Sequence, residues 1–153
     1  MAENRPLPDV LAPFGSLIDR TAATFQLDGQ LLRAQILVES SGNPWAFRYE
    51  PAFFTRYIRH NPHAKGFLYG PLAACSYGLL QILLETALEL GYPDRPEHLF
   101  VPDTGLVWGA RYLKKCLNRS HDDVFTALQL YNGSGDAALA YAHKVFTTAG
   151  RPV

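Results

Sequence analysis

The chain contains 153 residues, of which 48% are hydrophobic and 18% are charged. This size and balance suit one compact globular domain and exclude a disordered chain or a coiled coil. Lysine and arginine total 14, and so do aspartate and glutamate, which leaves a net charge of zero. A neutral chain offers no broad positive field to nucleic acid, and no stretch approaches the roughly 20 apolar residues that span a bilayer. We therefore expect no nucleic-acid partner and no membrane insertion.

The start of the chain and its cysteines set the expected organisation. Residues 1–10 are polar and proline-rich, which predicts a flexible arm before a single domain over residues 11–150. The first twenty residues lack a basic start followed by an apolar run, so they predict no secretory signal and synthesis in the cytoplasm. Cys75 and Cys116 lack metal-ligand spacing and are expected to be reduced, partly buried thiols, with one disulfide as the alternative.

Apolar residues recur at steps of three and four through most of the chain, which predicts a mainly α-helical fold with about six helices. The first helix is expected to begin near Pro13 and to continue to Phe25. The second follows Asp28, a good N-cap residue, and must end at the Gly-Asn-Pro sequence that starts at Gly42.

The middle of the chain is expected to alternate between loops and helices. Residues 45–51 predict an extended segment or a small hairpin strand, and residues 51–60 predict a helix. Residues 61–77 contain several glycines and prolines and predict a loop or lid. Helical spacing then resumes over residues 78–90.

The last third of the chain predicts three helices. The Val-Pro-Asp-Thr sequence at residues 101–104 opens the first of them. Asp122 and Asp123 are placed to cap the second, and the Asn-Gly-Ser-Gly sequence at residues 132–135 ends it and separates it from the last helix.

Glu39 is the first candidate functional residue. It shares one face of the second predicted helix with Leu32 and Ile36, so a carboxyl group completes an apolar stripe. Burial and the negative end of the helix dipole both disfavour the charged form, which predicts a raised pKa for Glu39. An acid that stays protonated near neutral pH is what cleavage of a glycosidic bond requires. The alternative is a solvent-exposed Glu39 at a frayed helix end.

The second candidate is the sequence SYGLLQI at residues 76–82. Ser76 can hydrogen-bond a carboxyl group, and Gly78 allows the backbone to approach a ligand closely. Gln81 offers a donor and an acceptor to a sugar. The alternative is an ordinary helix start capped by Ser76.

The third candidate is the sequence LQLYNGSG at residues 128–135. Tyr131 continues the helical stripe of Val124 and Leu128, so its ring is expected to point inward and its hydroxyl to need a partner. A phenol that reaches a buried carboxyl group would help to hold it in one orientation. The alternative is a core tyrosine followed by a turn at Asn132 and Gly133.

In this order, the segments resemble the soluble (SLT-type) lytic transglycosylases of the goose-type-lysozyme-like superfamily. The similar segments are ILVESSGNPWA, SYGLLQI, LFVPDTGLVWGARYLKKCL and ALQLYNGSG, and the resemblance covers about residues 31–145. The order and spacing of four segments make the resemblance specific. It implies a compact, mainly α lysozyme-like domain with at most a small β hairpin near an active-site cleft.

The resemblance also implies roles for individual residues. Glu39 matches the catalytic acid, and Tyr131 and Ser76 match residues that support it. The expected substrate-binding residues are Gly78, Leu79, Gln81 and Asn132. Trp45, just after the catalytic helix, is the better candidate for stacking on a sugar, because Trp108 adjoins a core stripe and is expected to pack there.

The reaction that the resemblance implies is cleavage of the bond between N-acetylmuramic acid and N-acetylglucosamine in peptidoglycan. Glu39 protonates the leaving oxygen and then, as a carboxylate, accepts a proton from the 6-hydroxyl of muramic acid, which leaves a 1,6-anhydro sugar. The expected partner is the peptidoglycan glycan strand, bound by a monomer. No cofactor is implied, and the histidines lack metal-ligand spacing, so we assign no metal.

Two alternative functions stay open at this point. Goose-type lysozymes place a second acid after the catalytic glutamate to position water, and Glu50 is the candidate for a hydrolytic muramidase here. An inverting hydrolase needs its carboxyl groups roughly 6.5–9.5 Å apart. The competing interpretation of Glu50 is a surface ion pair with Arg48 or Arg56. The other alternative function is a non-catalytic glycan-binding virion protein, against which the intact set of candidate residues argues.

A cell-wall enzyme without a secretory signal needs another route to its substrate. We expect a phage or prophage endolysin that is released by a holin or carried in a virion, or an effector that a secretion machine delivers. In either case the enzyme would act in the periplasm or the cell wall.

Overall fold

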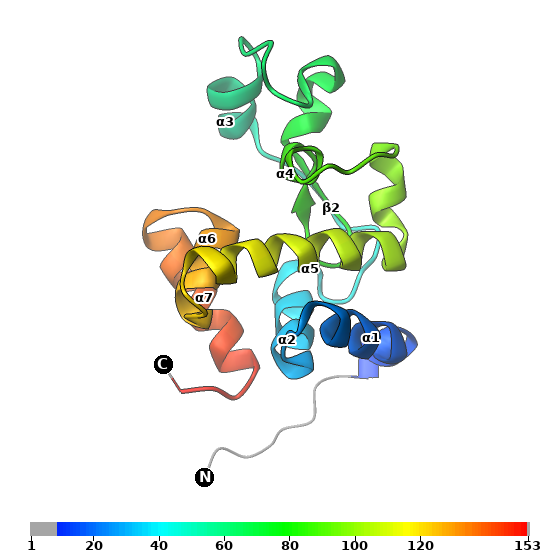
Figure 1. Cartoon of the computed structure of the whole chain (residues 1–153), viewed down its shortest axis with the longest axis vertical. Helices are drawn as coiled ribbons and strands as arrows, with labels where there is room; N and C mark the ends of the chain where they lie inside the picture. The colour runs from blue at the N-terminus through cyan, green and yellow to red at the C-terminus, as the bar shows by residue number, and fades with distance from the viewer. Residues whose placement is uncertain (1–8, 153) are drawn as a thin grey trace. The chain divides into compact units, whose positions relative to one another are not determined.

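The computed structural model describes residues 9–152 (Figure 1). Most of the arm expected over residues 1–10 therefore lies outside the described residues. The chain divides into two compact units. The first combines the chain up to Gly42 with the chain from Ala110 onward, and the second runs from Asn43 to Gly109. The prediction of a mainly helical fold with a small β element is confirmed.

The first unit consists of helices. A 3₁₀ segment, η1 (Asp9–Phe14), precedes the first helix, which therefore begins slightly later than the sequence predicted. Helix α7 packs against α6 and α2, and α1 packs against α2 (Figure 1). The α-helices of this unit are α1 (Gly15–Phe25), α2 (Gly29–Ser40), the part of α5 (Pro102–Arg119) from Ala110, α6 (Val124–Asn132) and α7 (Gly135–Thr148).

Helix α2 has the boundaries that its sequence predicted. The Asp28 carboxylate accepts hydrogen bonds from the backbone N–H groups of Gln30 and Leu31, at 2.8 and 3.2 Å. These contacts satisfy donors that would otherwise lack an intrahelical partner. At the other end, Ser41 adopts a left-handed conformation with φ of 54°, which stops the helix directly after Ser40. Glu39 therefore lies in the last turn of α2.

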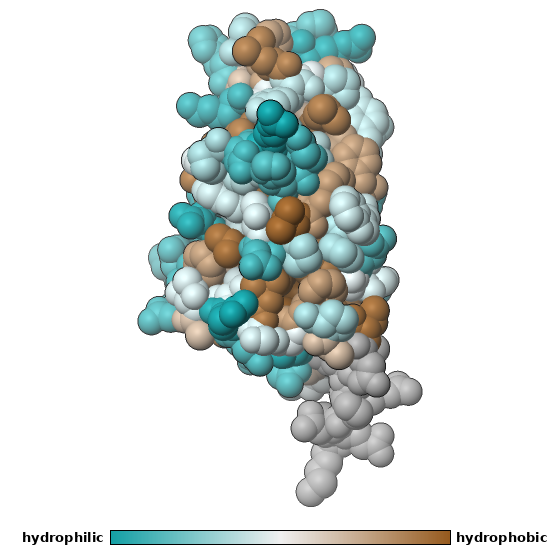
Figure 2. Space-filling model, turned by 90° about the vertical axis from the view of Figure 1, so that its right-hand side faces the viewer, coloured by the Kyte–Doolittle hydropathy of each residue, from teal (hydrophilic) through white to brown (hydrophobic). Residues whose placement is uncertain are grey.

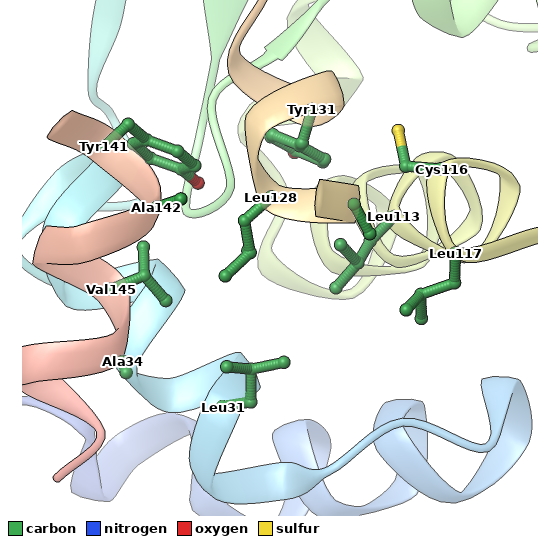
Figure 3. Packing of buried hydrophobic residues seen from close by; sticks show 11 residues of the cluster. Leu31, Ala34, Leu113, Cys116, Leu117, Leu128, Tyr131, Tyr141, Ala142 and Val145 are labelled. Carbon is green, nitrogen blue, oxygen red and sulfur yellow. The ribbon is translucent and has the colours of Figure 1, made fainter. Parts of the chain in front are cut away.

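A cluster of buried side chains from α2, α5, α6 and α7 forms the core of the first unit (Figure 3). Leu113, Leu128 and Val145 are fully buried in it, and burial of such side chains contributes about 1.5–3 kcal/mol each. Tyr131 and Tyr141 lie together at one end of the cluster, and Leu31 lies at the other (Figure 3). Two phenol groups thus enter an otherwise apolar core.

The second unit contains a three-stranded antiparallel sheet in the order β1, β2, β3. Ser76 is the middle residue of the central strand and pairs with Arg48 on one side and Leu83 on the other. The strands are β1 (Phe47–Tyr49), β2 (Cys75–Tyr77) and β3 (Ile82–Leu83). The helical elements are α3 (Pro51–Phe53), which continues as a π-turn over Phe54–Ile58, two 3₁₀ segments (Phe67–Ala74 and Pro96–Phe100), α4 (Leu84–Glu89) and the start of α5.

The helix predicted over residues 78–90 was wrong in its first half. Residues 78–81 form the turn between β2 and β3, and only α4 is helical. Gly78 and Gln81 have positive φ angles, 76° and 48°, which a helix does not allow. A short apolar run such as this one fits a buried strand as well as a helix, and pairing with β2 decides between them. Ser76 is consequently a strand residue and does not cap a helix.

The predicted loop over residues 61–77 holds a 3₁₀ segment and is fastened to α4. The buried carboxylate of Glu85 accepts hydrogen bonds from the backbone N–H groups of Lys65 and Gly66, at 2.8 and 2.6 Å. A Cβ at position 66 would lie 2.8 Å from Glu85 Oε2, so glycine allows this close approach. The predicted loop is therefore anchored to α4 at residues 65 and 66.

Neither cysteine forms a disulfide. Cys75 and Cys116 are both buried, as the sequence predicted. Burial raises the pKa of both thiols, and the Glu50 carboxylate adds to the effect at Cys75. Both groups are therefore expected to stay protonated and weakly nucleophilic at neutral pH.

The surface is mixed in character. On the face shown in Figure 2, hydrophobic residues occur in small groups between hydrophilic ones. Within residues 9–152, no helix combines the length and the apolar character needed to span a bilayer.

Candidate active site

Glu39 is half-buried in the last turn of α2, where the sequence placed it. Its carboxyl group lies close enough to Tyr131 on α6 and Tyr141 on α7 to raise the pKa of both phenols. Glu39 thus faces other elements of the first unit, which is not what a frayed, solvent-directed helix end would do.

Tyr131 points inward, as its position on the stripe of α6 predicted. It is only 9% exposed, and its ring lies 5.0 Å from that of Tyr112 on α5. Burial raises the pKa of Tyr131 well above 10, and the Glu39 carboxylate raises it further. The phenol therefore keeps its proton at any ordinary working pH and can donate it in a hydrogen bond. Asn132, the last residue of α6, is exposed directly beside it.

Tyr141 is a candidate site residue that the sequence analysis missed. It is 8% exposed, and its ring extends from α7 toward α6 (Figure 3). Burial raises the pKa of Tyr141 well above 10, and the neighbouring Glu39 carboxylate is the next cause. Its sequence position could have indicated this, because Tyr141 shares the apolar stripe of α7 with Ala138, Ala142 and Val145.

Gln35 is the second residue that was missed. It lies one helical turn before Glu39 on α2 and has no exposed surface. Within residues 9–152, its amide atoms and the Tyr141 hydroxyl make no hydrogen bond of regular geometry. The Gln35 amide and the Glu39 carboxyl group nevertheless lie close enough to Tyr141 to shift the pKa of its phenol. The signal in the sequence was a glutamine directly before Ile36 on the inward face of the helix.

The first unit therefore combines one carboxyl group with two phenols that stay protonated. Such phenols donate hydrogen bonds to a carboxylate and stabilise its charged form, while partial burial favours the protonated acid. A carboxyl group under these opposing influences can lose a proton in one step and regain it in another, as general acid and base catalysis requires.

In the second unit, Gly78 and Gln81 shape the turn after β2. A Cβ at Gly78 would lie 2.6 Å from the carbonyl oxygen of Leu99, so glycine is needed for contact between two backbone segments. The amide nitrogen of Gln81 donates to the carbonyl oxygens of Ala46 and Gly78, at 2.9 and 3.0 Å. The turn is thus tied to the loop that carries Trp45. Binding of glycan by these residues stays a prediction.

The remaining predicted substrate residues differ in accessibility. The side chain of Leu79 is buried, so it supports the turn from within. Trp45 is 73% exposed, and its ring centre lies 5.6 Å from that of Phe100. Trp108 is half-buried and packs edge-on against Tyr92, at 5.3 Å, as predicted. Trp45 therefore presents an aromatic surface that a sugar can reach.

Glu50 forms the ion pair that the competing interpretation predicted. Its carboxylate lies 2.9 Å from the guanidinium of Arg48, and both side chains are exposed. A surface pair of this kind contributes about 0–1 kcal/mol. Its role as a second acid stays a prediction.

The predicted site residues thus fall into two groups. Glu39 and Tyr131 come together in the first unit, with Asn132 at the end of the same helix as Tyr131. In the second unit, the strand of Ser76 continues into the turn that Gln81 fastens to the loop after Trp45. Within the described part of the chain, no group of three His, Cys, Asp or Glu side chains is arranged to hold a metal ion.

Comparison with known proteins identifies the family. No curated protein matches the chain. Among solved structures, the chain is similar to an inactive Glu→Gln variant of the lytic transglycosylase Slt from Pseudomonas aeruginosa, with a TM-score of 0.66 and 19% sequence identity. The match covers 92% of this chain but only 24% of that protein. The model of the Transglycosylase SLT domain matches residues 16–149. The chain therefore belongs to the Transglycosylase SLT domain family.

Proposed function

We propose that the chain is a peptidoglycan lytic transglycosylase in which Glu39 acts first as a general acid and then as a general base. The carrying observation is the half-buried carboxyl group of Glu39 beside two phenols whose pKa it raises. Membership of the family supports the proposal. The similar structure supports it further, because its name records an inactive protein with a Glu→Gln substitution.

The proposed reaction breaks the bond between C1 of N-acetylmuramic acid and O4 of N-acetylglucosamine. O4 leaves with the proton of Glu39, while positive charge develops at C1. The 6-hydroxyl oxygen of the same muramic acid then bonds to C1, and its proton passes to the Glu39 carboxylate. The enzyme is restored, no water is consumed, and one product ends in a 1,6-anhydro sugar.

Tyr131 and Tyr141 are proposed to steady Glu39 through both steps. Their hydroxyls stay protonated, so each can donate to the carboxylate that forms when O4 leaves. Hydrogen-bond donors of this kind stabilise the Glu39 carboxylate that exists between the two steps, and they limit the rotation of the carboxyl group.

Glycan binding is proposed for the aromatic residues of the second unit. Trp45, Phe47 and Tyr77 surround the ring of Phe100, with ring centres 5.6, 6.1 and 5.2 Å from it. Trp45 and Phe47 are exposed, and flat apolar rings of this kind suit the apolar faces of sugar rings. Ser76, Gln81 and Asn132 are the proposed polar contacts.

Product mass tests the proposal. Purified peptidoglycan digested by the chain should yield fragments with anhydro ends, each one water lighter than a reducing end. Glu39→Gln should lower the rate by about 10²–10⁴ because it removes the transferable proton. The competing hydrolase predicts reducing ends only, together with strong loss of activity in Glu50→Gln. A non-catalytic glycan-binding protein predicts binding with no fragments from either variant or the native chain.

The route by which the enzyme reaches the cell wall, its phage origin and its monomeric state all stay predictions. Turbidity clearing of intact cells, compared with clearing of purified walls, would test delivery separately from the reaction.

A further inference from the structure

The first unit buries two polar groups, the Gln35 amide and the Tyr141 hydroxyl, among mainly apolar side chains. Both amide atoms of Gln35 and the hydroxyl of Tyr141 lack a partner of regular geometry within residues 9–152. Gln35 is 0% exposed and Tyr141 is 8% exposed. A buried, unsatisfied polar group destabilises a fold. A leucine at this position would carry no such cost, because its side chain has no polar atoms to satisfy.

Both groups lie beside Glu39. Gln35 precedes it by one turn on α2, so the two side chains lie on the same side of the helix. Tyr141 reaches the same region from α7, and both Gln35 and Glu39 influence its hydroxyl. The three side chains therefore form one polar group at the edge of the apolar cluster, and the half-buried candidate acid is its most accessible member.

We infer that Gln35 is a positioning residue that acts on Glu39 together with Tyr141, an inference that rests on the proposed function. The Gln35 amide orients the Tyr141 hydroxyl, and the amide N–H and the hydroxyl O–H donate to the Glu39 carboxylate when the proton has left. Gln35 is buried, so it does not touch the glycan. Its effect is expected on the chemical step and not on substrate binding.

The sign of the expected pH effect follows from the donors. Hydrogen bonds to a carboxylate stabilise its charged form, so their loss should raise the pKa of Glu39. Because the first step needs protonated Glu39, a raised pKa moves the alkaline limb of the rate profile to higher pH. Among the described residues, Tyr131 on α6 and Tyr141 on α7 are titratable groups that lie close enough to Glu39 to feel its charge. Helix α1 also packs against α2, and there the charged Asp19 is already paired with Arg33 of α2, at 2.8 Å.

The test compares Gln35→Leu with the native chain on a soluble peptidoglycan oligosaccharide. We expect an unchanged or higher melting temperature, a kcat about tenfold lower, an unchanged KM and an alkaline limb at higher pH. Gln30→Leu is the matched control, because it makes the same substitution at an exposed position of α2. The control should match the native chain in all four measurements.

A native kcat and a native alkaline limb in Gln35→Leu would overturn the inference. Tyr141→Phe provides a second route if Gln35→Leu fails to fold, because it removes only the hydroxyl. An unshifted limb in that variant would overturn the inference as well. Glu39→Gln distinguishes a failure of the proposed function from a failure of the role of Gln35. Full activity in Glu39→Gln would refute the proposed function, whereas an inactive Glu39→Gln with a native Gln35→Leu profile would refute only the role of Gln35.

Discussion

The Tyr141 hydroxyl on α7 faces the Glu39 carboxyl group at the end of α2, and after burial this carboxylate is the main cause of the raised pKa of Tyr141. An acid and a phenol from opposite ends of the chain are thus brought together in the first unit. A charged acid beside the phenol disfavours ionisation of the phenol, so at neutral pH Tyr141 stays a hydrogen-bond donor through the proposed reaction.

The buried tyrosines predict a loss of stability at high pH. Below about pH 10 a tyrosine is protonated in both the folded and the unfolded chain and contributes no pH dependence. Above that value the unfolded chain ionises while Tyr141 in the fold does not, so stability falls by about 1.4 kcal/mol per pH unit for this group. Tyr141→Phe should reduce that slope in urea unfolding measured between pH 9 and about 11. Tyr57→Phe, at an exposed tyrosine, is the control, and equal slopes in both variants would contradict the prediction.

Asp28 predicts the opposite pH dependence. Burial raises the pKa of Asp28, but the N–H groups of Leu31 and Gln30 and the ion pair with Arg151 outweigh it, so the pKa lies below 3.8. Its contribution is therefore present above the ordinary pKa of aspartate and is lost as the pH falls through the lower, folded value. Asp28→Ala should cost about 0.5–2 kcal/mol at pH 7, and the difference should shrink in acid.

Asp28→Asn is the matched control for this prediction. Asparagine caps helices as well as aspartate does but cannot form the charged pair with Arg151. Urea unfolding of the asparagine variant should show most of the native stability at pH 7. A loss as large as that of Asp28→Ala would mean that the ion pair matters more than the cap.

Gly78 should tolerate no side chain. Its φ of 76° strains any other residue, and a Cβ would lie 2.6 Å from the backbone oxygen of Leu99. Gly78→Ala is expected to cost about 2–4 kcal/mol, because strain and a backbone clash add. Gly91 also has a positive φ, but a Cβ there would have no atom within 4 Å. Gly91→Ala should therefore cost only about 1–2 kcal/mol. Thermal unfolding of both variants checks the difference, and equal losses would remove the role of the Leu99 contact.

Trp45 should contribute to glycan binding but not to stability. Its side chain is 73% exposed, and its ring centre lies 5.6 Å from that of Phe100. Trp45→Ala is expected to raise KM about tenfold with little change in kcat, while Trp45→Phe keeps part of the affinity. Kinetics on a soluble peptidoglycan oligosaccharide measure this. A native KM in Trp45→Ala would show that the exposed ring lies outside the binding surface.

The sequence alone determined the helices whose signals are local. Asp28 caps α2 and the residues from Ser41 onward end it, because both effects act within one turn of backbone. The spacing of residues along one helix is also a local signal, and it predicted that Glu39 lies on an apolar stripe and that Tyr131 points inward. The family resemblance rests on four short sequence segments, and it assigns Glu39 and Tyr131 to the site without any tertiary contact.

The tertiary structure decided what depends on partners distant in the sequence. Residues 78–83 became a turn and a strand because β1 and β2 offered a sheet to pair with, although their apolar run also fits a helix. Gln35 and Tyr141 became part of the candidate site only because α7 packs against α2. A periodic pattern tells which face of a helix is buried, but it does not tell which other helix covers that face, since many packings bury the same apolar area.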